Sequence, residues 1–277
     1  MSAYKKIFNT YTPEEKQLYW NLGNGLQAVD GLKPSDYLIE QQNKEIAGEI
    51  ALSDVKANIH KYYELRNEDL LLSQKEADIA SVKINEYLRE MTFRLHPLSL
   101  KQIHKYIFEG LDGFDAGEYR TYNVSKKEPV LFGKSVRYED WQNIEDYLEY
   151  DIEKELKAMN KRTAFSPEEF SNFITGIWQI HPFKEGNTRT IAVFTIQYLN
   201  YLGFEINNEP FEKNASYFRD ALVRASYNNM EYKLSPDFTY INNFFENVIY
   251  GKNHVLNSEN LIAMELSESN ETKYEHP

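Results

Sequence analysis

One short segment brings together side chains that suit chemistry on a phosphate group. It contains a histidine, a glutamate, a Gly-Asn pair and an arginine: His181, Glu185, Gly186, Asn187 and Arg189. A histidine can act as a general base near neutral pH. A carboxylate beside phosphates needs a cation between them, and Mg²⁺ takes one or two carboxylates together with phosphate oxygens. We therefore predict that His181 is a general base and that Glu185 is a metal ligand.

This segment must form a tight loop between two helices. Pro182 disfavours helical geometry at the residue before it, so the upstream helix, expected over 167–180, must end near His181. Apolar residues at helical spacing predict the next helix over 187–202. A Gly-Asn pair at the start of a helix leaves free N–H groups at the positive end of its dipole, where anions bind. Arg189 opposes that dipole unless an anion is bound there.

Each of these residues also has an ordinary structural explanation, so the prediction depends on their combination. A lone histidine beside a proline is most often a cap, and a lone Gly-Asn pair is usually a turn. The combination, His-Pro-Phe-Lys-Glu-Gly-Asn-Thr-Arg-Thr-Ile-Ala over 181–192, resembles the signature of the Fic family, His-Pro-Phe-x-(Asp/Glu)-Gly-Asn-Gly-Arg-x-x-Arg. Similar flanking segments at 100–108, 117–124 and 217–225 extend the resemblance over about residues 70–229.

The resemblance implies an all-α fold, a helical bundle with a short β-hairpin flap, and protein adenylyltransferase activity. Such an enzyme transfers AMP from ATP, with Mg²⁺, to a Tyr, Ser or Thr hydroxyl of a target protein, and self-modification is one form of it. His181 would deprotonate the target hydroxyl, and Phe183 would anchor the loop in the core. The nucleotide and its phosphates would lie against Gly186, Asn187, Thr188 and Arg189, with Mg²⁺ on Glu185.

Two positions depart from the family pattern. Thr188 replaces a glycine, and its hydroxyl either crowds the phosphates or adds a donor. Ala192 replaces the second arginine, which in the family helps to hold the γ-phosphate. Two alternatives therefore stay open beside AMP transfer: a relative that transfers phosphate or another nucleotide, and a non-enzymatic module that binds peptides.

The stretch 120–138 is the one segment without a helical pattern. Two β-prone runs surround Gly133, so we predict a hairpin that projects from the helical body. By resemblance, the residues at its tip, Val130, Leu131, Phe132 and Gly133, would clamp a target segment by strand addition.

The first 66 residues are expected to form helices over 13–29, over 36–48 and from about residue 53. They resemble a small antitoxin fused to the domain, of the kind whose Ser/Thr-x-x-x-Glu-(Gly/Asn) helix silences Fic enzymes. Asp30 and Gly31 stand at its Glu-(Gly/Asn) positions, with Leu26 in place of Ser or Thr. The arginine that pairs with this glutamate in the family is Ala192 here, so the usual ion pair is not expected. Inhibition by Asp30 and a plain stabilising cap, with Asp30-Gly31 as a helix stop, both remain open.

Composition sets the remaining expectations. The chain has 277 residues, a net charge of -12 and no cysteine, which excludes thiolate chemistry and argues against nucleic-acid binding. The sequence has no long apolar run, so we expect no signal peptide and no membrane span. This favours a cytoplasmic protein or one exported without a recognisable signal. The expected domains are an antitoxin-like segment over 1–66, a Fic domain over 67–252 and an acidic, flexible tail over 253–277. The family resemblance is compatible with a homodimer.

Overall fold

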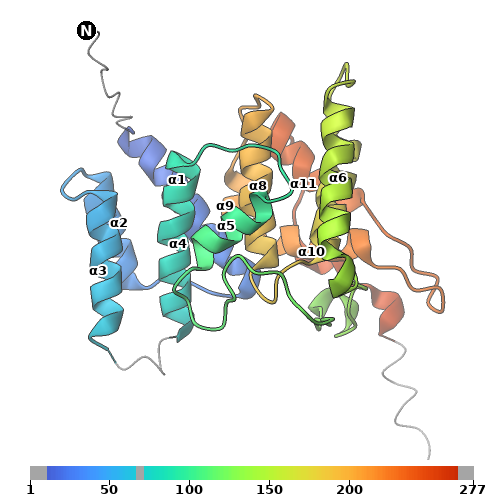
Figure 1. Ribbon diagram of the computed structural model, residues 1–277, viewed down its shortest axis with the longest axis horizontal. Coiled ribbons are helices and arrows are strands. Elements are labelled where there is room, and N and C mark those ends of the chain that lie inside the picture. The colour runs from blue at the N-terminus through green and yellow to red at the C-terminus, as the bar shows by residue number, and fades with distance from the viewer. Residues whose placement is uncertain (1–10, 67–71, 268–277) are drawn as a thin grey trace, which may run out of the picture.

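The computed structural model describes residues 11–66 and 72–267, and this part of the chain is built from α-helices (Figure 1). Within these residues the β pairing is limited to a single bridge between Asn229 and Leu234, so the all-α prediction is confirmed. The N-terminal elements are α1 (Pro13–Gly25), the 3-10 helix η1 (Leu26–Asp30), α2 (Asp36–Ile46) and α3 (Leu52–Glu64). The remaining α-helices are α4 (Leu72–Glu90), α5 (Ser99–Phe108), α6 (Ile144–Met159), α7 (Pro167–Ile180), α8 (Asn187–Tyr201), α9 (Glu209–Lys213), α10 (Ala215–Ser226) and α11 (Thr239–Tyr250). Short 3-10 turns lie at η3 (Pro129–Leu131), η4 (Trp141–Asn143), η5 (Ser258–Leu261) and η6 (Met264–Leu266).

Helix α8 is the centre of the fold. Its residues from Asn187 to Leu199 are all buried, which is expected of a helix surrounded by other elements. It packs against α4, α5, α7 and η1, and Figure 1 shows it in the middle of the molecule. The loop that precedes α8 is therefore held between two helices embedded in the core.

The N-terminal helices share their core with the rest of the chain. Thr12 starts α1 with a capping box to Glu15, as its sequence suggests. Gly23 faces α4 so closely that a Cβ there would lie 2.6 Å from the Ser81 carbonyl oxygen, and one at Gly25 would lie 2.2 Å from that of Glu212. Only glycine permits this approach, and it places η1, which follows α1, directly beside α8 and α10.

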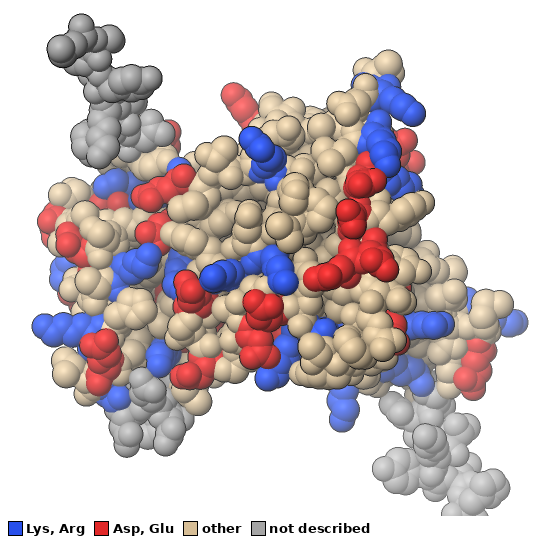
Figure 2. Space-filling view, in the orientation of Figure 1, with Lys and Arg blue, Asp and Glu red and all other residues tan. Residues whose placement is uncertain are grey.

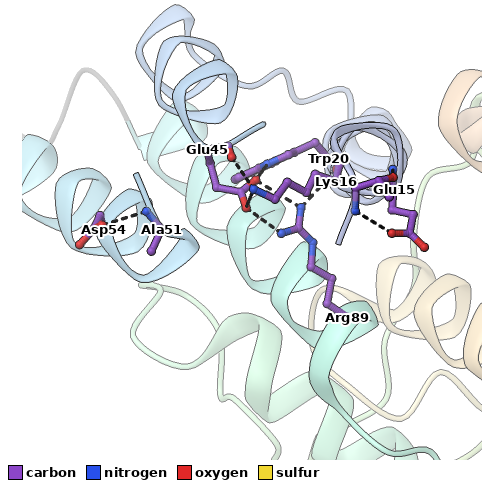
Figure 3. Close-up of polar contacts among 8 residues, drawn as sticks. Glu15, Lys16, Trp20, Glu45, Ala51, Asp54 and Arg89 are labelled. Atoms are coloured by element: carbon purple, nitrogen blue, oxygen red, sulfur yellow. Dashed lines mark hydrogen bonds and ion pairs between the residues drawn. The ribbon is translucent and has the colours of Figure 1, made fainter. Parts of the chain in front are cut away.

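A buried ion cluster joins α1 and α2 to α4 (Figure 3). The carboxylate of Glu45 accepts hydrogen bonds from Trp20 Nε1 and Arg89 Nη1, each at 3.0 Å, and lies 3.3 Å from Lys16 Nζ. The side chains of Glu45 and Arg89 are almost fully buried, so removal of either partner would leave an uncompensated charge inside the protein.

A second cluster fixes α2 and α3 to α4. The buried carboxylate of Asp78 accepts hydrogen bonds from Ser35 Oγ at 2.5 Å and from Tyr63 Oη at 2.7 Å. Burial raises the pKa of Asp78, although these hydrogen bonds oppose the shift. The two clusters together attach the N-terminal helices to α4, so that they form part of one packed body.

The C-terminal segment packs where the sequence predicts a flexible tail. Leu261, Ala263 and Leu266 are buried, and the Ala263 N–H donates to the Val130 carbonyl at 2.8 Å. Small apolar side chains spaced among acidic ones explain the difference, because only the apolar ones turn inward. The part of this predicted tail after residue 267 lies outside the described residues.

The surface carries both signs of charge. Figure 2 shows Lys and Arg side chains interspersed with Asp and Glu, with acidic side chains along α6. This face has no broad basic patch of the kind that binds nucleic acids. None of the helices in the described ranges is long and apolar enough to cross a membrane.

Candidate active site

The loop between α7 and α8 has the predicted shape. Helix α7 ends at Ile180, and His181 takes a left-handed conformation with φ 52° ahead of Pro182. Gly186 has φ 74° and precedes α8, and a Cβ there would lie 2.5 Å from the Phe108 ring. Glycine is therefore required at 186 both by the backbone conformation and by the lack of space.

Phe183 and Asn187 lock this loop internally. The Asn187 amide accepts from the Phe183 N–H at 2.9 Å and donates to the Phe183 carbonyl at 2.7 Å. The ring of Phe183 stacks on His104 with 3.8 Å between ring centres, so Phe183 lies where the sequence predicts an anchor. The side chain of Asn187 is thus occupied by the loop, and only its backbone N–H is left for an anion.

Arg120 ties the end of α7 to the neighbouring segment. Its Nε donates to the His181 carbonyl at 2.8 Å, and its Nη2 donates to the Ile180 carbonyl at 3.2 Å. A buried guanidinium at the negative end of a helix stabilises the terminal carbonyls. Arg120 therefore fixes the backbone from which the His181 ring projects.

The His181 ring is buried and uncharged. It stacks on Tyr138 at 4.0 Å and meets Trp178 edge to face. Burial, with smaller contributions from Lys126 and Arg120, lowers the pKa of His181 to about 3. No described residue forms a hydrogen bond with its buried Nδ1. The imidazole is thus neutral at physiological pH, the state that a general base needs before it takes a proton.

A pocket of about 170 Å³ adjoins this histidine at the start of α8. It is lined by Asp30, Lys126, Lys127, Glu128, Trp178, His181, Glu185, Gly186, Asn187, Thr188 and Arg219. Of the predicted site residues, it brings together His181, the metal ligand candidate Glu185, the phosphate-binding candidates 186–188 and the proposed inhibitory Asp30. The N-terminus of α8 forms one wall, so backbone N–H groups and the helix dipole favour an anion there.

Thr188 lies in this wall as a hydrogen-bond acceptor. Its Oγ1 accepts from Trp178 Nε1 at 3.0 Å. Because the oxygen receives that bond, the hydroxyl hydrogen is left to donate elsewhere. This geometry favours the added donor over the crowding that the replacement of glycine also suggested.

Arg189 is the predicted phosphate-binding residue that does not line the pocket. Its side chain is 2% exposed, and Nε lies 2.8 Å from Asp30 Oδ2, although its N–H does not point at that oxygen. Nη1 donates to Gln27 at 3.0 Å and Nη2 to Glu76 at 2.6 Å. Asp30 and Gln27 belong to η1, so the N-terminal unit separates Arg189 from the pocket.

The ion pair expected to be absent is thus replaced by a different one. Residue 192 is a buried alanine and cannot pair with Asp30. Asp30 forms an ion pair with Arg189 instead. Gly31 follows with φ 70° and ends η1. The helix-stop function and the contact with the motif arginine therefore coexist in the same two residues.

Glu185 is an exposed carboxylate of the pocket. Its side chain is 53% exposed and pairs with Lys126 Nζ at 2.7 Å. The described residues contain no cluster of three or more His, Asp or Glu side chains that could hold a metal by themselves. A single carboxylate fits Mg²⁺ when phosphate oxygens complete the coordination sphere, so Glu185 suits a cation that arrives with a nucleotide.

The flap prediction is wrong in its secondary structure. Residues 120–138 form no strands, and η3 makes a tight turn in which the Glu128 N–H donates to the Lys134 carbonyl. Pro129 cannot donate to a ladder, and Val130 and Leu131 are buried against the C-terminal segment. Phe132 and Gly133 at the tip remain exposed. A groove of about 630 Å³ runs beside the flap, lined by residues that include Val124, Ser135 and Tyr138.

Several site residues were not anticipated from the sequence. Gln27 and Glu76 bind Arg189, Glu128 and Arg219 line the pocket, and Lys126 pairs with Glu185. They come from η1, α4, α10 and the flap. The resemblance of 217–225 to a family segment is a signal near Arg219, but it gives this residue no role, and the local sequence of the other four indicates none either.

Comparison with known proteins supports the motif. Residues 94–199 match the model of the Fic/DOC family. A probable protein adenylyltransferase of Sinorhizobium fredii (strain NBRC 101917 / NGR234) is 29% identical over 134 residues, which cover 45% of this chain and 62% of that protein. The chain therefore spans less than two thirds of the length of this curated relative.

Proposed function

We propose, on the premise that residues 94–199 form a domain of the Fic/DOC family, that this chain transfers AMP from ATP to a Tyr, Ser or Thr hydroxyl of a protein. The observation that carries the proposal is the pocket in which a buried neutral histidine faces the free N-terminus of α8. The name of the Sinorhizobium fredii protein supports the same chemistry.

In the proposed reaction, the hydroxyl oxygen of the target attacks the α-phosphorus of ATP while His181 takes its proton. The bond from the α-phosphorus to the bridging oxygen breaks, and pyrophosphate leaves. Bound phosphates are anions near the imidazole, so they would raise its pKa above the value of about 3 and strengthen it as a base. The N–H groups at the start of α8 stabilise the charge on the phosphates.

Mg²⁺ would supply charge neutralisation between the phosphates. Glu185 would hold it after exchanging Lys126 for the cation, and Lys126 would then be free to contact a phosphate oxygen. The Thr188 hydroxyl, oriented by Trp178, has a hydrogen to donate to the same phosphates.

We also propose that the N-terminal unit restrains this activity. Asp30 and Gln27 bind the guanidinium of Arg189. Without these contacts, the guanidinium would be free to bind the phosphates. A carboxylate at this position also repels an incoming triphosphate. The regulatory segment would thus act as the antitoxin resemblance of 1–66 implies, but through Arg189 and not through residue 192.

The test is incubation of the purified full chain with ATP and Mg²⁺, with and without a mixture of candidate proteins, followed by intact mass. AMP transfer adds about 329 Da, the mass of an adenylyl group bound through one ester. This gain should require His181 and Mg²⁺, and it should be larger for Asp30→Asn. A gain of one phosphoryl group would favour phosphate transfer. ATP binding without any mass gain would leave transfer to another target or of another nucleotide, and the absence of both binding and transfer would favour the non-enzymatic peptide-binding module.

A further inference from the structure

Among the described residues, one arginine lines the pocket, and it does not come from the motif. Arg219 of α10 lines the pocket together with His181 and the start of α8, whereas the buried Arg189 does not. The second turn of α8 offers no cation, because residue 192 is an alanine buried in the core. In the conformation that the structure describes, Arg219 is therefore the arginine placed to contact a ligand in this pocket.

The guanidinium of Arg219 is held in place by its own helix. Its Nε and Nη2 donate to Asp220 Oδ1 at 3.1 and 2.8 Å. The Asp220 side chain is buried and the Arg219 side chain is 26% exposed, so a carboxylate fixed in the protein orients a guanidinium that is open on the pocket side. This arrangement preorganises the cation and lowers the entropy cost of binding an anion.

The remaining nitrogen of Arg219 contacts the same segment that covers Arg189. Nη1 donates to the Val29 carbonyl at 2.9 Å, and Val29 directly precedes Asp30, the partner of Arg189. Two consecutive residues of η1 thus cover two arginines from different helices, α8 and α10. Both guanidinium groups thus contact η1, whose Asp30 lines the pocket together with His181.

We propose that Arg219 binds the pyrophosphate part of the nucleotide, in place of a second arginine on α8. The proposal rests on the proposed function of the pocket as a nucleoside triphosphate site. Arginine forms bidentate charge-assisted hydrogen bonds with phosphate, and the Val29 carbonyl is the contact that a phosphate oxygen would replace. Release of η1 therefore frees Arg189 and Arg219 together.

The charges around Arg219 are consistent with this exchange. Burial alone would lower the pKa of Arg219, but the carboxylates of Asp220, Glu128 and Asp30 outweigh it and raise the pKa. The guanidinium is therefore charged at every relevant pH, and anionic groups surround it in the absence of a ligand. A triphosphate would substitute its own charge for that of Asp30.

The experiment measures binding, so that it does not depend on transfer. Isothermal titration calorimetry with ATP and with AMP, in Mg²⁺, is carried out on the full chain and on its Asp30→Asn form. Arg219→Gln is compared with Arg94→Gln, which removes the same charge from an exposed position on the loop between α4 and α5. Arg219→Gln should weaken ATP binding about tenfold or more and AMP binding by less than about twofold, because only ATP carries the pyrophosphate.

Arg219→Lys keeps the charge and should restore part of the ATP affinity, which a merely structural arginine would not do. An equal loss for ATP and AMP, unchanged ATP binding by Arg219→Gln, or no ATP binding in either background would overturn the proposal. A specific loss of ATP affinity without any His181-dependent mass gain would support the Arg219 site without supporting AMP transfer.

Discussion

Asp30 Oδ2 lies 2.8 Å from Arg189 Nε, and this pair joins the N-terminal unit to the first turn of α8. The arginine is almost fully buried and has a second carboxylate partner in Glu76. Loss of Asp30 would therefore not leave the guanidinium unpaired. The contact is well suited to control, because its removal changes the pocket more than it changes the stability of the core.

Asp30→Asn should raise the rate of AMP transfer and the affinity for ATP about fivefold or more, the range of typical coupling between two sites. The cause is the loss of a negative charge that both repels the triphosphate and binds Arg189. Rates are measured by intact mass over time, beside Asp36→Asn, which removes an exposed carboxylate from the same unit. Equal rates for wild type and Asp30→Asn would contradict inhibition by this residue.

Deletion of residues 1–66 would also remove Asp30, but it is a poorer test of inhibition. It would remove Glu45 from the buried Arg89, and Ser35 and Tyr63 from the buried Asp78. We therefore expect this truncation to lose stability as well as inhibition, so the point substitution is the cleaner variant.

His181 should make the fold sensitive to acid. Its pKa of about 3 in the folded state lies below the value near 6.5 of an unfolded histidine. As the pH falls below about 6.5, His181 becomes protonated in the unfolded chain but stays neutral in the folded protein, so the free energy of unfolding decreases. Between pH 7 and pH 5 this costs about 2 kcal/mol.

The check is urea unfolding of wild type, His181→Gln and His96→Gln at both pH values. His181→Gln should lose about 2 kcal/mol less than wild type over this interval. The exposed His96 provides the matched control for the removal of one histidine. If His181→Gln keeps the full acid sensitivity of wild type, then the histidine is not held neutral by burial.

The sequence predicted the parts of the fold that local chemistry determines. Pro182 ends α7 where expected, and Thr12 and Ser166 cap their helices. Helix α11 has no comparable local signal, because its residues, Thr239–Tyr250, are mostly β-branched, aromatic or Asn, and its N-cap makes no side-chain hydrogen bond. Its helical structure depends on packing against α7 and α10.

The site was predictable where its residues belong to a recognisable sequence pattern, as at 181–189 and at Asp30. The partners of Arg189 come from η1 and α4, and the pocket arginine comes from α10. The β-prone runs of the flap led to a wrong hairpin prediction. Val130 and Leu131 are buried by long-range packing and do not pair in a β-ladder. Such contacts depend on the tertiary arrangement, which periodicity does not contain.

Arg120 should be essential for the position of His181. Arg120→Gln removes the donors to the His181 and Ile180 carbonyls, and buried carbonyls without a donor are costly. The free energy of unfolding should decrease by about 3 kcal/mol, and transfer should slow even at temperatures where the protein remains folded. Urea unfolding and transfer rates are compared with Arg137→Gln, an exposed arginine close to the flap. Equal effects of the two substitutions would contradict this role.

Glu185 should control the dependence on Mg²⁺. Glu185→Gln should reduce transfer about a hundredfold or more at a fixed low Mg²⁺ concentration, because the cation loses its one protein carboxylate. Folding should change little, since Glu185 is exposed and its pair with Lys126 is a surface ion pair. The measurement is a Mg²⁺ titration of the transfer rate, with the exposed Glu118→Gln as the control. A Glu185→Gln protein with a normal Mg²⁺ titration would place the metal elsewhere.

The C-terminal turns should hold the flap in its present shape. A chain that ends at residue 256 would lose the hydrogen bond from Ala263 to Val130 and the buried side chains of Leu261 and Leu266. Burial of two leucines contributes on the order of 4 kcal/mol, so the free energy of unfolding should fall by a similar amount. Hydrogen exchange at 128–134 should accelerate more than exchange in α8, because the flap loses a direct partner.

A chain that ends at residue 267 keeps both turns and separates this effect from the loss of acidic charge. Unchanged exchange at 128–134 in the shorter chain would mean that the flap is held by the helical body alone.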